Sequence, residues 1–397
     1  MRVPTECYQL EAELAAQFPL LRPAQVQGLA IWVWGTIVAG SACQAAVACA
    51  LTPLFATRHA ARQYLREWLY AGADRAKACA TTLPVETCFV CLLRWVVRLW
   101  RGTNLPLAID VTARADRVVV LTVAVLYRGC AIPVAWRVLP ANRQGAWTAS
   151  LVTLLTLLAP AVPPDWTVLV LTDRGLWSPA IWRQIRAIGW HPVMRIRPTT
   201  LCAPLGRKRQ YARDLIPGPG HAWVGRATVF RDPDKRLQGT LVVYWEEKQT
   251  EPWIVVSDLP PDQIGVVWYG LRVWVELGFR TLKRFGWHWE RTQRTDPHRV
   301  ACHWLVMAVA TLWTLSAGTR DEDAEQLGRA PANLRVCPAD CPSPIHRTIS
   351  IFARGLLWMR WQLLRQRRLW TRRWLLPERW PDPPPYIRIT VHQEPST

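Results

Sequence analysis

The spacing of apolar residues changes about a quarter of the way along the chain. Residues 1–100 repeat their apolar positions at helical spacing, and Ala60–Ala78 is amphipathic with several basic residues along it. From residue 105 the sequence turns to β-branched runs over Leu105–Thr112, Arg117–Tyr127 and Ala131–Leu139. Short turns containing Asp, Gly or Cys separate these runs, which therefore predict three consecutive strands in an antiparallel meander.

The segments that follow alternate between helix and strand. Ala146–Leu158 and Pro179–Ile188 have helical periodicity, whereas Trp166–Thr172 is a continuous apolar run typical of a strand buried on both faces. His191–Ile196 predicts one more strand, which gives the order β-β-β-α-β-α-β. A meander followed by strand–helix crossovers predicts a mixed sheet covered by helices.

Residues 198–250 depart from this alternation, because they are rich in Pro, Gly and Arg and contain only short strands. We interpret them as a β-rich insertion. The strand Trp253–Ser257 is followed by predicted helices over Asp262–Phe285 and Pro297–Ser316, a polar linker, and a strongly basic helix over Ile349–Trp374.

The pattern divides the chain into three regions. We predict a helical N-terminal region over residues 1–100, an α/β domain over 101–320 and a basic C-terminal region over 321–397.

The charge balance points to a polyanionic partner. The chain has 49 Lys and Arg against 29 Asp and Glu, which gives a net charge of +20. Nearly all of the basic residues are arginines, whose planar guanidinium binds phosphate through two hydrogen bonds. A GC-rich genome would explain arginine in place of lysine, but not the surplus of positive charge. The excess therefore favours nucleic acid as the partner.

Two apolar stretches, Leu29–Phe55 and Val300–Gly318, are long enough to be considered as membrane spans. Both contain polar side chains and a long charged region separates them, so buried helices of a soluble protein are the favoured interpretation. The first 30 residues lack the basic and then apolar order of a signal peptide. Among 11 scattered cysteines only Cys88 and Cys91 form a Cys-x-x-Cys pair, which favours reduced thiols over a structural zinc.

Two aspartates stand at the ends of predicted strands. Asp110 ends the first strand, and Asp173 follows the apolar run Trp166–Thr172. Ligands of layered sheets bind at the carboxyl ends of strands. A charge at the end of an apolar strand is costly unless it is paired or binds a metal. Either aspartate alone would be interpreted as a cap or a turn residue.

The predicted helix Asp262–Phe285 supplies a third carboxylate, Glu276. At 100° per residue one face of this helix is apolar, and the opposite face carries Tyr269, Arg272, Glu276, Arg280, Lys283 and Arg284. A surface helix with Arg–Glu pairs is the alternative, but each such pair contributes only a few tenths of a kcal/mol. A metal-binding glutamate flanked by cations that hold phosphates explains the stripe better. Three convergent carboxylates suit two Mg²⁺ ions, with Mn²⁺ as a substitute, and such a pair of ions promotes in-line displacement at phosphorus.

These residues resemble the DDE transposases, in particular the insertion-sequence family four group. That group is marked by Tyr, two residues, Arg, three residues, Glu, six residues and Lys, and Tyr269, Arg272, Glu276 and Lys283 have the same spacing. The resemblance implies a ribonuclease H-like fold with a β-rich insertion, in which Asp110, Asp173 and Glu276 hold the metal ions. It implies that Tyr269, Arg272 and Lys283 contact phosphates near the transposon end.

The resemblance also implies a cut-and-paste route on double-stranded DNA. Water cleaves at the transposon end, the freed 3′-hydroxyl forms a hairpin with the opposite strand, and the reopened ends join target DNA. Relatives flip a base onto a tryptophan of the insertion, for which Trp223, Trp245 and Trp253 are candidates, although packing is the favoured explanation for any one of them. A homodimer in the DNA complex and a cytoplasmic, nucleoid-associated location in a bacterium, away from the membrane, complete the implied picture.

Three other interpretations stay open at this point. The chain could be a DNA-binding protein derived from a transposase and without catalysis, a two-metal nuclease that does not join strands, or, more distantly, a membrane protein. The basic C-terminal helix could bind DNA or a second subunit, or be a solvated surface.

Overall fold

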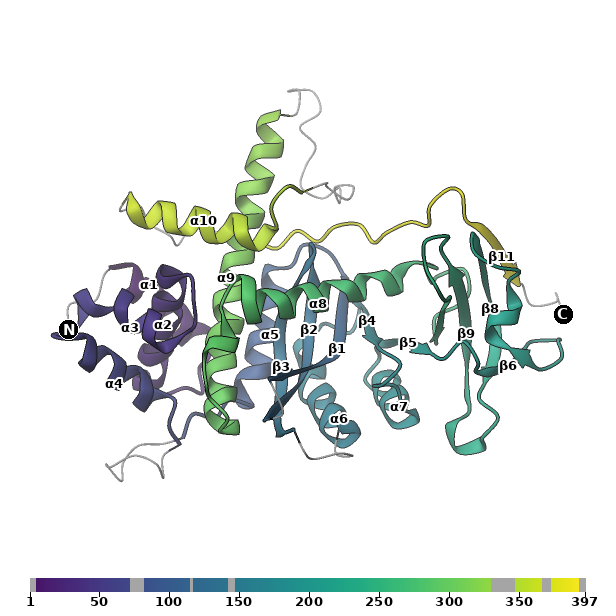
Figure 1. Ribbon diagram of the computed structural model, residues 1–397, viewed down its shortest axis with the longest axis horizontal. Helices are drawn as coiled ribbons and strands as arrows, with labels where there is room; N and C mark the ends of the chain where they lie inside the picture. The colour runs from purple at the N-terminus through teal and green to yellow at the C-terminus, as the bar shows by residue number, and fades with distance from the viewer. Residues whose placement is uncertain are drawn as a thin grey trace.

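The computed structural model describes residues 5–71, 82–114, 117–141, 147–329, 347–365 and 373–392. Figure 1 shows a helical group at the N-terminal end, a helix-covered sheet in the middle and a β-rich part at the C-terminal end. One sheet runs through the last two, with the order β3-β2-β1-β4-β5-β10-β9-β8-β6-β7 and β11 beside β8. The prediction of a mixed sheet flanked by helices is therefore confirmed.

The central strands follow the predicted order. They are β1 (Asn104–Arg114), β2 (Val118–Tyr127), β3 (Cys130–Pro140), β4 (Thr167–Thr172) and β5 (His191–Ile196). Strand β2 is antiparallel to β1 and β3, whereas β1, β4 and β5 are parallel neighbours. Every residue of β2 is buried, because helices cover both faces of the sheet.

The described N-terminal residues are helical, as expected. The helices are α1 (Thr5–Gln17), α2 (Pro23–Ala39), α3 (Gln44–Ala50), α4 (Arg58–Trp68) and α5 (Thr87–Leu99). The amphipathic stretch Ala60–Ala78 begins inside α4, and its last residues lie outside the described part of the chain. Helix α5 packs against β3 and against α6 (Trp147–Leu158), so it belongs to the sheet's cover rather than to the N-terminal group.

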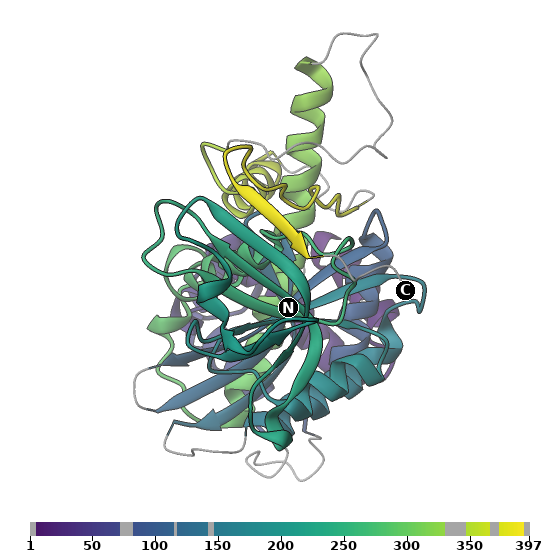
Figure 2. The same ribbon diagram turned by 90° about the vertical axis from the view of Figure 1, so that its right-hand side faces the viewer.

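The predicted β-rich insertion continues the central sheet. Strand β10 (Trp253–Ser257) pairs antiparallel with both β5 and β9, and thereby joins the two halves edge to edge. The remaining strands are β6 (Leu201–Pro204), β7 (Gln210–Tyr211), β8 (His221–Val229) and β9 (Leu237–Trp245). The C-terminal strand β11 (Arg388–His392) lies parallel to β8, as Figure 2 shows in yellow.

The helix predicted over Asp262–Phe285 begins later than expected and changes its winding. A 3₁₀ turn over Trp268–Arg272 leads into α8 (Val273–Arg280), and a π-helical turn over Thr281–Phe285 follows. The constant rotation of 100° per residue assumed from the sequence therefore does not hold beyond Arg280.

Helix α9 (Pro297–Arg329) is much longer than predicted, so the expected polar linker after Ala317 is wrong up to Arg329. Its C-terminal half rises above the sheet, and α10 (Ile351–Leu364) lies across it (Figure 1). The two helices approach at Gly318 and Gly355, where an added Cβ would meet backbone atoms at 2.1 and 1.8 Å. Of the basic helix predicted over Ile349–Trp374, residues 366–372 lie outside the described chain.

The two apolar stretches are inside the fold. Helix α9 contains a segment long and apolar enough to span a membrane, but 89% of that window is buried in the protein. Helices α2 and α3 pass the same test only as a pair bent by 89°. Both stretches are therefore helices that pack inside the fold, as predicted from their polar residues.

The segment after α10 is tied to the helical core by a buried ionic cluster, which we call the Arg128 cluster. Arg128 lies in the β2–β3 hairpin turn with φ 44°, next to Gly129 with φ 76°, as a two-residue type I′ turn requires. Its guanidinium donates to Glu322 at 2.7 Å, to Asp323 at 3.2 Å and to the carbonyl of Leu376 at 2.8 Å.

A second arginine extends this cluster. Arg347 donates to Glu322 and Glu378. Burial alone raises the pKa of Glu322, but Arg347 and Arg128 outweigh it, so this pKa lies below its ordinary value. Glu322 and Asp323, which lie in the segment predicted to be a polar linker, are therefore paired inside the fold.

Candidate active site

The register of two parallel strands places Asp110 and Asp173 side by side. Ile109 of β1 pairs with Thr172 of β4, so the next residue on each strand is one of the two aspartates. The sequence suggested that Asp110 ends its strand. This is wrong, because β1 continues to Arg114 and pairs with β2 there. It stands instead at the point where β4 stops, which opens that side of β1.

Arg272 joins these aspartates to Glu276. Its Nη2 lies 2.9 Å from Asp110 Oδ2 and 3.8 Å from Asp173 Oδ2, and its Nη1 lies 2.8 Å from Glu276 Oε1. Arg272 precedes α8 and Glu276 lies one turn later, so the helix presents both to the sheet. The three carboxylates therefore converge on one guanidinium, although 166 residues separate the first from the last.

Burial differs across this group. The side chains of Asp110 and Arg272 are 13% and 11% exposed, whereas those of Asp173 and Glu276 are 41% and 58% exposed. Burial raises the pKa of the Asp110 carboxyl, although the charge of Arg272 and a hydrogen bond from the Val111 amide act against it. Burial lowers the pKa of Arg272, but the negative charges around it outweigh this and the pKa lies above its ordinary value.

Tyr269 and Trp253 line the side of the group nearest to the β-rich half. The Tyr269 ring is buried and meets the Trp253 ring edge-on, with centroids 5.5 Å apart. The Arg195 guanidinium also lies over the Tyr269 ring, 5.9 Å from its centroid. Burial raises the pKa of Tyr269, and the charge of Asp173 adds to this, so the phenol is neutral. Of the three candidate tryptophans, Trp253 is the one that contacts a residue of the predicted site.

The other two tryptophans are occupied elsewhere. Trp223 is 1% exposed and stacks against His392 of β11, so it is not accessible as a platform for a base. Trp245 is half-buried, and its indole N–H donates to the Gln249 carbonyl at 2.9 Å within the turn that follows β9.

The remaining predicted cations lie further along α8 and its π turn. Arg280 is exposed and lies over the Phe285 ring, 5.2 Å from its centroid. Arg284 is exposed and pairs with Glu290 at 3.1 Å. Lys283 is half-buried, and this burial lowers its pKa. Together they form a cationic margin beyond Glu276 rather than part of the carboxylate group itself.

A second set of charges beside the site, formed by Glu251, Arg174 and Arg195, was not predicted from the sequence. Glu251 accepts a hydrogen bond from Arg195 at 2.8 Å and forms an ion pair with Arg174 at 2.9 Å. Arg174 directly follows Asp173, so Glu251 links the strand-end loop to the β-rich half. No signal in the sequence marks Glu251, because it lies in a turn among other charged residues.

The donor set of the group suits divalent cations, because carboxylate oxygens are the ligands that Mg²⁺ prefers. In the arrangement described here, however, no three acidic, His or Cys side chains of the described residues are close enough to share one ion. Arg272 occupies the space between the carboxylates and supplies the counter-charge. Cys88 does not offer an alternative metal site, since burial raises the pKa of its thiol to about 12.

Comparison with known proteins finds a family match over the middle of the chain. Residues 133–313 match the family model described as the transposase DDE domain. The match contains Asp173, strands β6 to β10, Arg272 and Glu276, whereas Asp110 lies before its first residue and β11 after its last. No curated protein matches the chain. The family match supports assignment as a DDE transposase.

Proposed function

We propose that this protein is a DNA transposase that cleaves transposon ends and joins them to target DNA, with Asp110, Asp173 and Glu276 as its metal ligands. The observation that carries the proposal is the convergence of these three carboxylates on Arg272, at 2.9, 3.8 and 2.8 Å. Three carboxylates held this close repel each other, and metal ions bound between them would relieve that repulsion. The strand order β3-β2-β1-β4-β5 further supports a ribonuclease H-like catalytic domain.

The residues of the site have separable tasks in this proposal. Asp110, Asp173 and Glu276 would hold two Mg²⁺ or Mn²⁺ ions, which supply charge stabilisation for the attacking and leaving oxygens at phosphorus. The hydrogen bond from the Val111 amide fixes the Asp110 carboxylate. Arg272, with Arg280, Lys283 and Arg284 beyond it, would bind phosphates of the DNA backbone. Tyr269, whose ring is buried and packs edge-on against Trp253, would contact a phosphate near the transposon end only where DNA binding exposes it.

We propose the cut-and-paste route of the insertion-sequence family four group, on the basis of the spacing of Tyr269, Arg272, Glu276 and Lys283. Water attacks phosphorus at the transposon end and releases a 3′-hydroxyl. This hydroxyl attacks the opposite strand to give a hairpin, which a second water opens. The freed 3′ ends then attack target DNA. Each step exchanges one P–O bond for another, so none requires an external energy source.

The test is strand cleavage by the full chain on duplexes that carry the sequences flanking its own gene. We expect Mg²⁺-dependent nicking at one position, which Asp110→Ala, Asp173→Ala and Glu276→Gln each abolish while binding of the same duplex persists. Supply of pre-cut ends then separates a transposase, which joins them to a plasmid, from a nuclease, which does not. Binding without any cleavage in Mg²⁺ or Mn²⁺ would instead identify a DNA-binding derivative.

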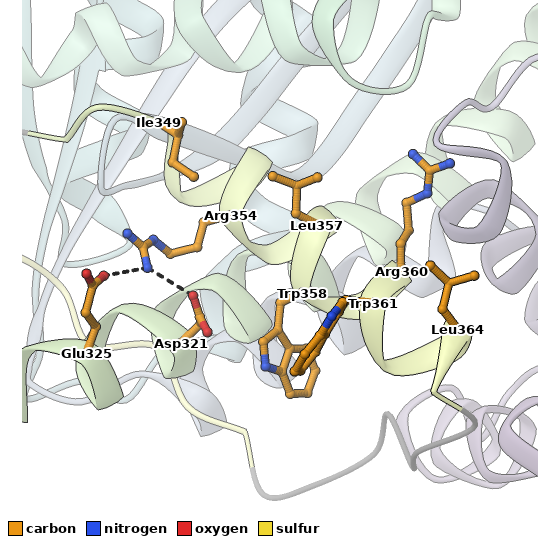
Figure 3. A pocket seen from close by; sticks show the side chains of 9 residues that line it. All are labelled: Asp321, Glu325, Ile349, Arg354, Leu357, Trp358, Arg360, Trp361 and Leu364. Carbon is orange, nitrogen blue, oxygen red and sulfur yellow. Dashed lines mark hydrogen bonds and ion pairs between the residues drawn. The ribbon is translucent and has the colours of Figure 1, made fainter. Parts of the chain in front are cut away.

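We also propose that the DNA complex contains a homodimer formed through α10. Leu357, Trp361 and Leu364 follow one face of this helix and are 60%, 44% and 84% exposed. They border a groove of about 770 Å³ that also contains the ion pairs of Arg354 with Asp321 and Glu325 (Figure 3). An exposed apolar stripe of this kind suits a self-complementary contact. Sedimentation of the protein with its DNA should give a dimer, and Leu357→Glu with Leu364→Glu should give a monomer; an unchanged dimer would place the interface elsewhere.

A further inference from the structure

The position of Arg272 conflicts with the task of the three carboxylates. Its two terminal nitrogens lie 2.9 Å from Asp110 Oδ2, 3.8 Å from Asp173 Oδ2 and 2.8 Å from Glu276 Oε1, which are oxygens of the proposed metal ligands. A guanidinium and a cation pair cannot both occupy the centre of one carboxylate group. In the DNA-free protein, the arginine therefore competes directly with divalent ions for the same ligands.

The charges make this competition effective. Three carboxylates and one guanidinium carry a net charge of −2, and a single divalent ion would already neutralise it. A second ion would bring excess positive charge into a group whose Asp110 and Arg272 side chains are nearly buried. Removal of the guanidinium restores a net charge of −3, which favours the binding of two ions.

Arg272 is nevertheless not locked in place. Its buried Nε has no hydrogen-bond partner among the described residues, and two of its three acidic partners are exposed to solvent. Arg128, by contrast, uses its Nε as well, in a bond to the Leu376 carbonyl. A DNA phosphate at the open side of the group would accept two hydrogen bonds from the Arg272 guanidinium. It would thereby replace the carboxylates as the partner of Arg272.

We propose that Arg272 is a displaceable counter-ion that couples metal loading to DNA binding. Without DNA it neutralises Asp110, Asp173 and Glu276 and weakens their affinity for divalent ions. When a DNA phosphate binds the guanidinium, the carboxylates are released and bind metal tightly. Arg272 acts here as a positioning residue, and the inference rests on the proposed function because it assumes that these carboxylates are the metal ligands.

Coupling of this kind is reciprocal. If DNA raises the affinity for metal by some factor, metal must raise the affinity for DNA by the same factor. Couplings of roughly 5- to 150-fold are common in proteins, and we expect about tenfold here. This coupling would keep the free protein from cutting DNA strands at sites where no phosphate binds Arg272.

The experiment measures Mn²⁺ binding to the full chain by the loss of the free-ion electron paramagnetic resonance signal, with no reaction involved. The wild type should bind Mn²⁺ weakly alone and about tenfold more tightly with a duplex that ends at the cleavage position. Arg272→Gln should bind Mn²⁺ about tenfold more tightly than the wild type without DNA, and DNA should add little. Arg137→Gln, which loses the same charge from an ion pair with Glu86, should behave as the wild type.

The outcomes separate the two levels of the account. If Arg272→Gln is folded by circular dichroism and binds Mn²⁺ no more tightly than the wild type, the counter-ion role of Arg272 is refuted. If Mn²⁺ binds to the wild-type complex but Asp110→Asn leaves that binding unchanged, the ions are elsewhere and the proposed function fails as well. Tighter binding in Arg272→Gln that Asp110→Asn abolishes in the double variant supports both.

Discussion

Arg128 and Arg272 each gather several acidic side chains, but they do so in opposite ways. The side chain of Arg128 has no exposed area, and it donates from Nε, Nη1 and Nη2 to Glu322, Asp323 and a backbone carbonyl. Arg272 contacts three carboxylates through its terminal nitrogens alone, with Asp173 at the longer distance of 3.8 Å, and the side chains of Asp173 and Glu276 are 41% and 58% exposed. All three guanidinium nitrogens of Arg128 therefore have partners. The Nε of Arg272 has no partner among the described residues, and its three carboxylates carry more charge than it neutralises.

This difference separates a structural cluster from a functional one. A buried ion pair is tolerated only when every donor and acceptor is satisfied, which the Arg128 cluster achieves by closing the C-terminal segment over α9. A site that exchanges one partner for another must keep some charged groups or donors unpaired. A group whose hydrogen bonds are all made forms no further ones with a ligand. The unmatched carboxylates around Arg272 have that character.

The largest expected effect is on stability, from Arg128→Met. Removal of one partner of a buried ionic group leaves the others uncompensated and costs about 3–5 kcal/mol. Denaturant unfolding should show this loss, and Mn²⁺ should not restore it. Arg137→Met, whose ion pair with Glu86 is half-exposed, should cost less than about 1 kcal/mol. Equal losses in the two variants would mean that the Arg128 cluster is not structural.

A smaller effect, dependent on pH, follows from the pKa of Glu322, which the fold lowers below its ordinary value of 4.5. A lowered pKa gives stability that is present above 4.5 and is lost as the pH falls through the value in the folded protein. We expect Glu322→Gln to cost about 2 kcal/mol at neutral pH, since its hydrogen bonds are to charged groups. The difference from the wild type should shrink steadily below pH 4.5. A difference that stays constant down to about pH 3 would contradict the assignment.

The smallest effect is expected from Arg272→Gln. Two of its three partners, Asp173 and Glu276, are partly solvated, so the variant should lose only about 1 kcal/mol without metal. Mn²⁺ at about 100 times its dissociation constant should return roughly 2.7 kcal/mol, and thus more than replace the arginine. Thermal unfolding with and without Mn²⁺ measures both values. If Mn²⁺ stabilises Arg128→Met to the same degree as Arg272→Gln, the contrast between the two clusters disappears.

The sequence was informative where local patterns coincide with the site. The strand that carries Asp110 was predicted from a β-branched run, and the strand that precedes Asp173 from a continuous apolar run. Their adjacency is seen only in the structure, where β1 pairs in parallel with β4. Glu276 was found because a carboxylate in a cationic stripe is unusual on an otherwise apolar helix. The rotation of Lys283 was not predictable, because the π turn after Arg280 leaves no periodic signal.

The Arg128 cluster could not be foreseen for a physical reason. The turn that holds Arg128 has positive φ, which sequence rules assign to Gly, Asn or Asp, so an arginine there suggests a solvated loop. Its partners Glu322 and Asp323 lie 194 and 195 residues away in the sequence. Considered without Arg128, these acidic residues are typical of a polar linker. The continuity of the sheet through β10 is likewise a long-range pairing that short windows do not reveal.

The central claim is that Asp110, Asp173 and Glu276 bind the ions that cleave DNA, and a change of ligand tests it most directly. A cysteine in place of a carboxylate favours softer ions over Mg²⁺. Asp110→Cys should therefore fail to nick the end duplex in Mg²⁺ and regain part of its activity in Mn²⁺, while the wild type is active in both. An Asp110→Cys protein that cleaves in Mg²⁺ as fast as the wild type would contradict the account.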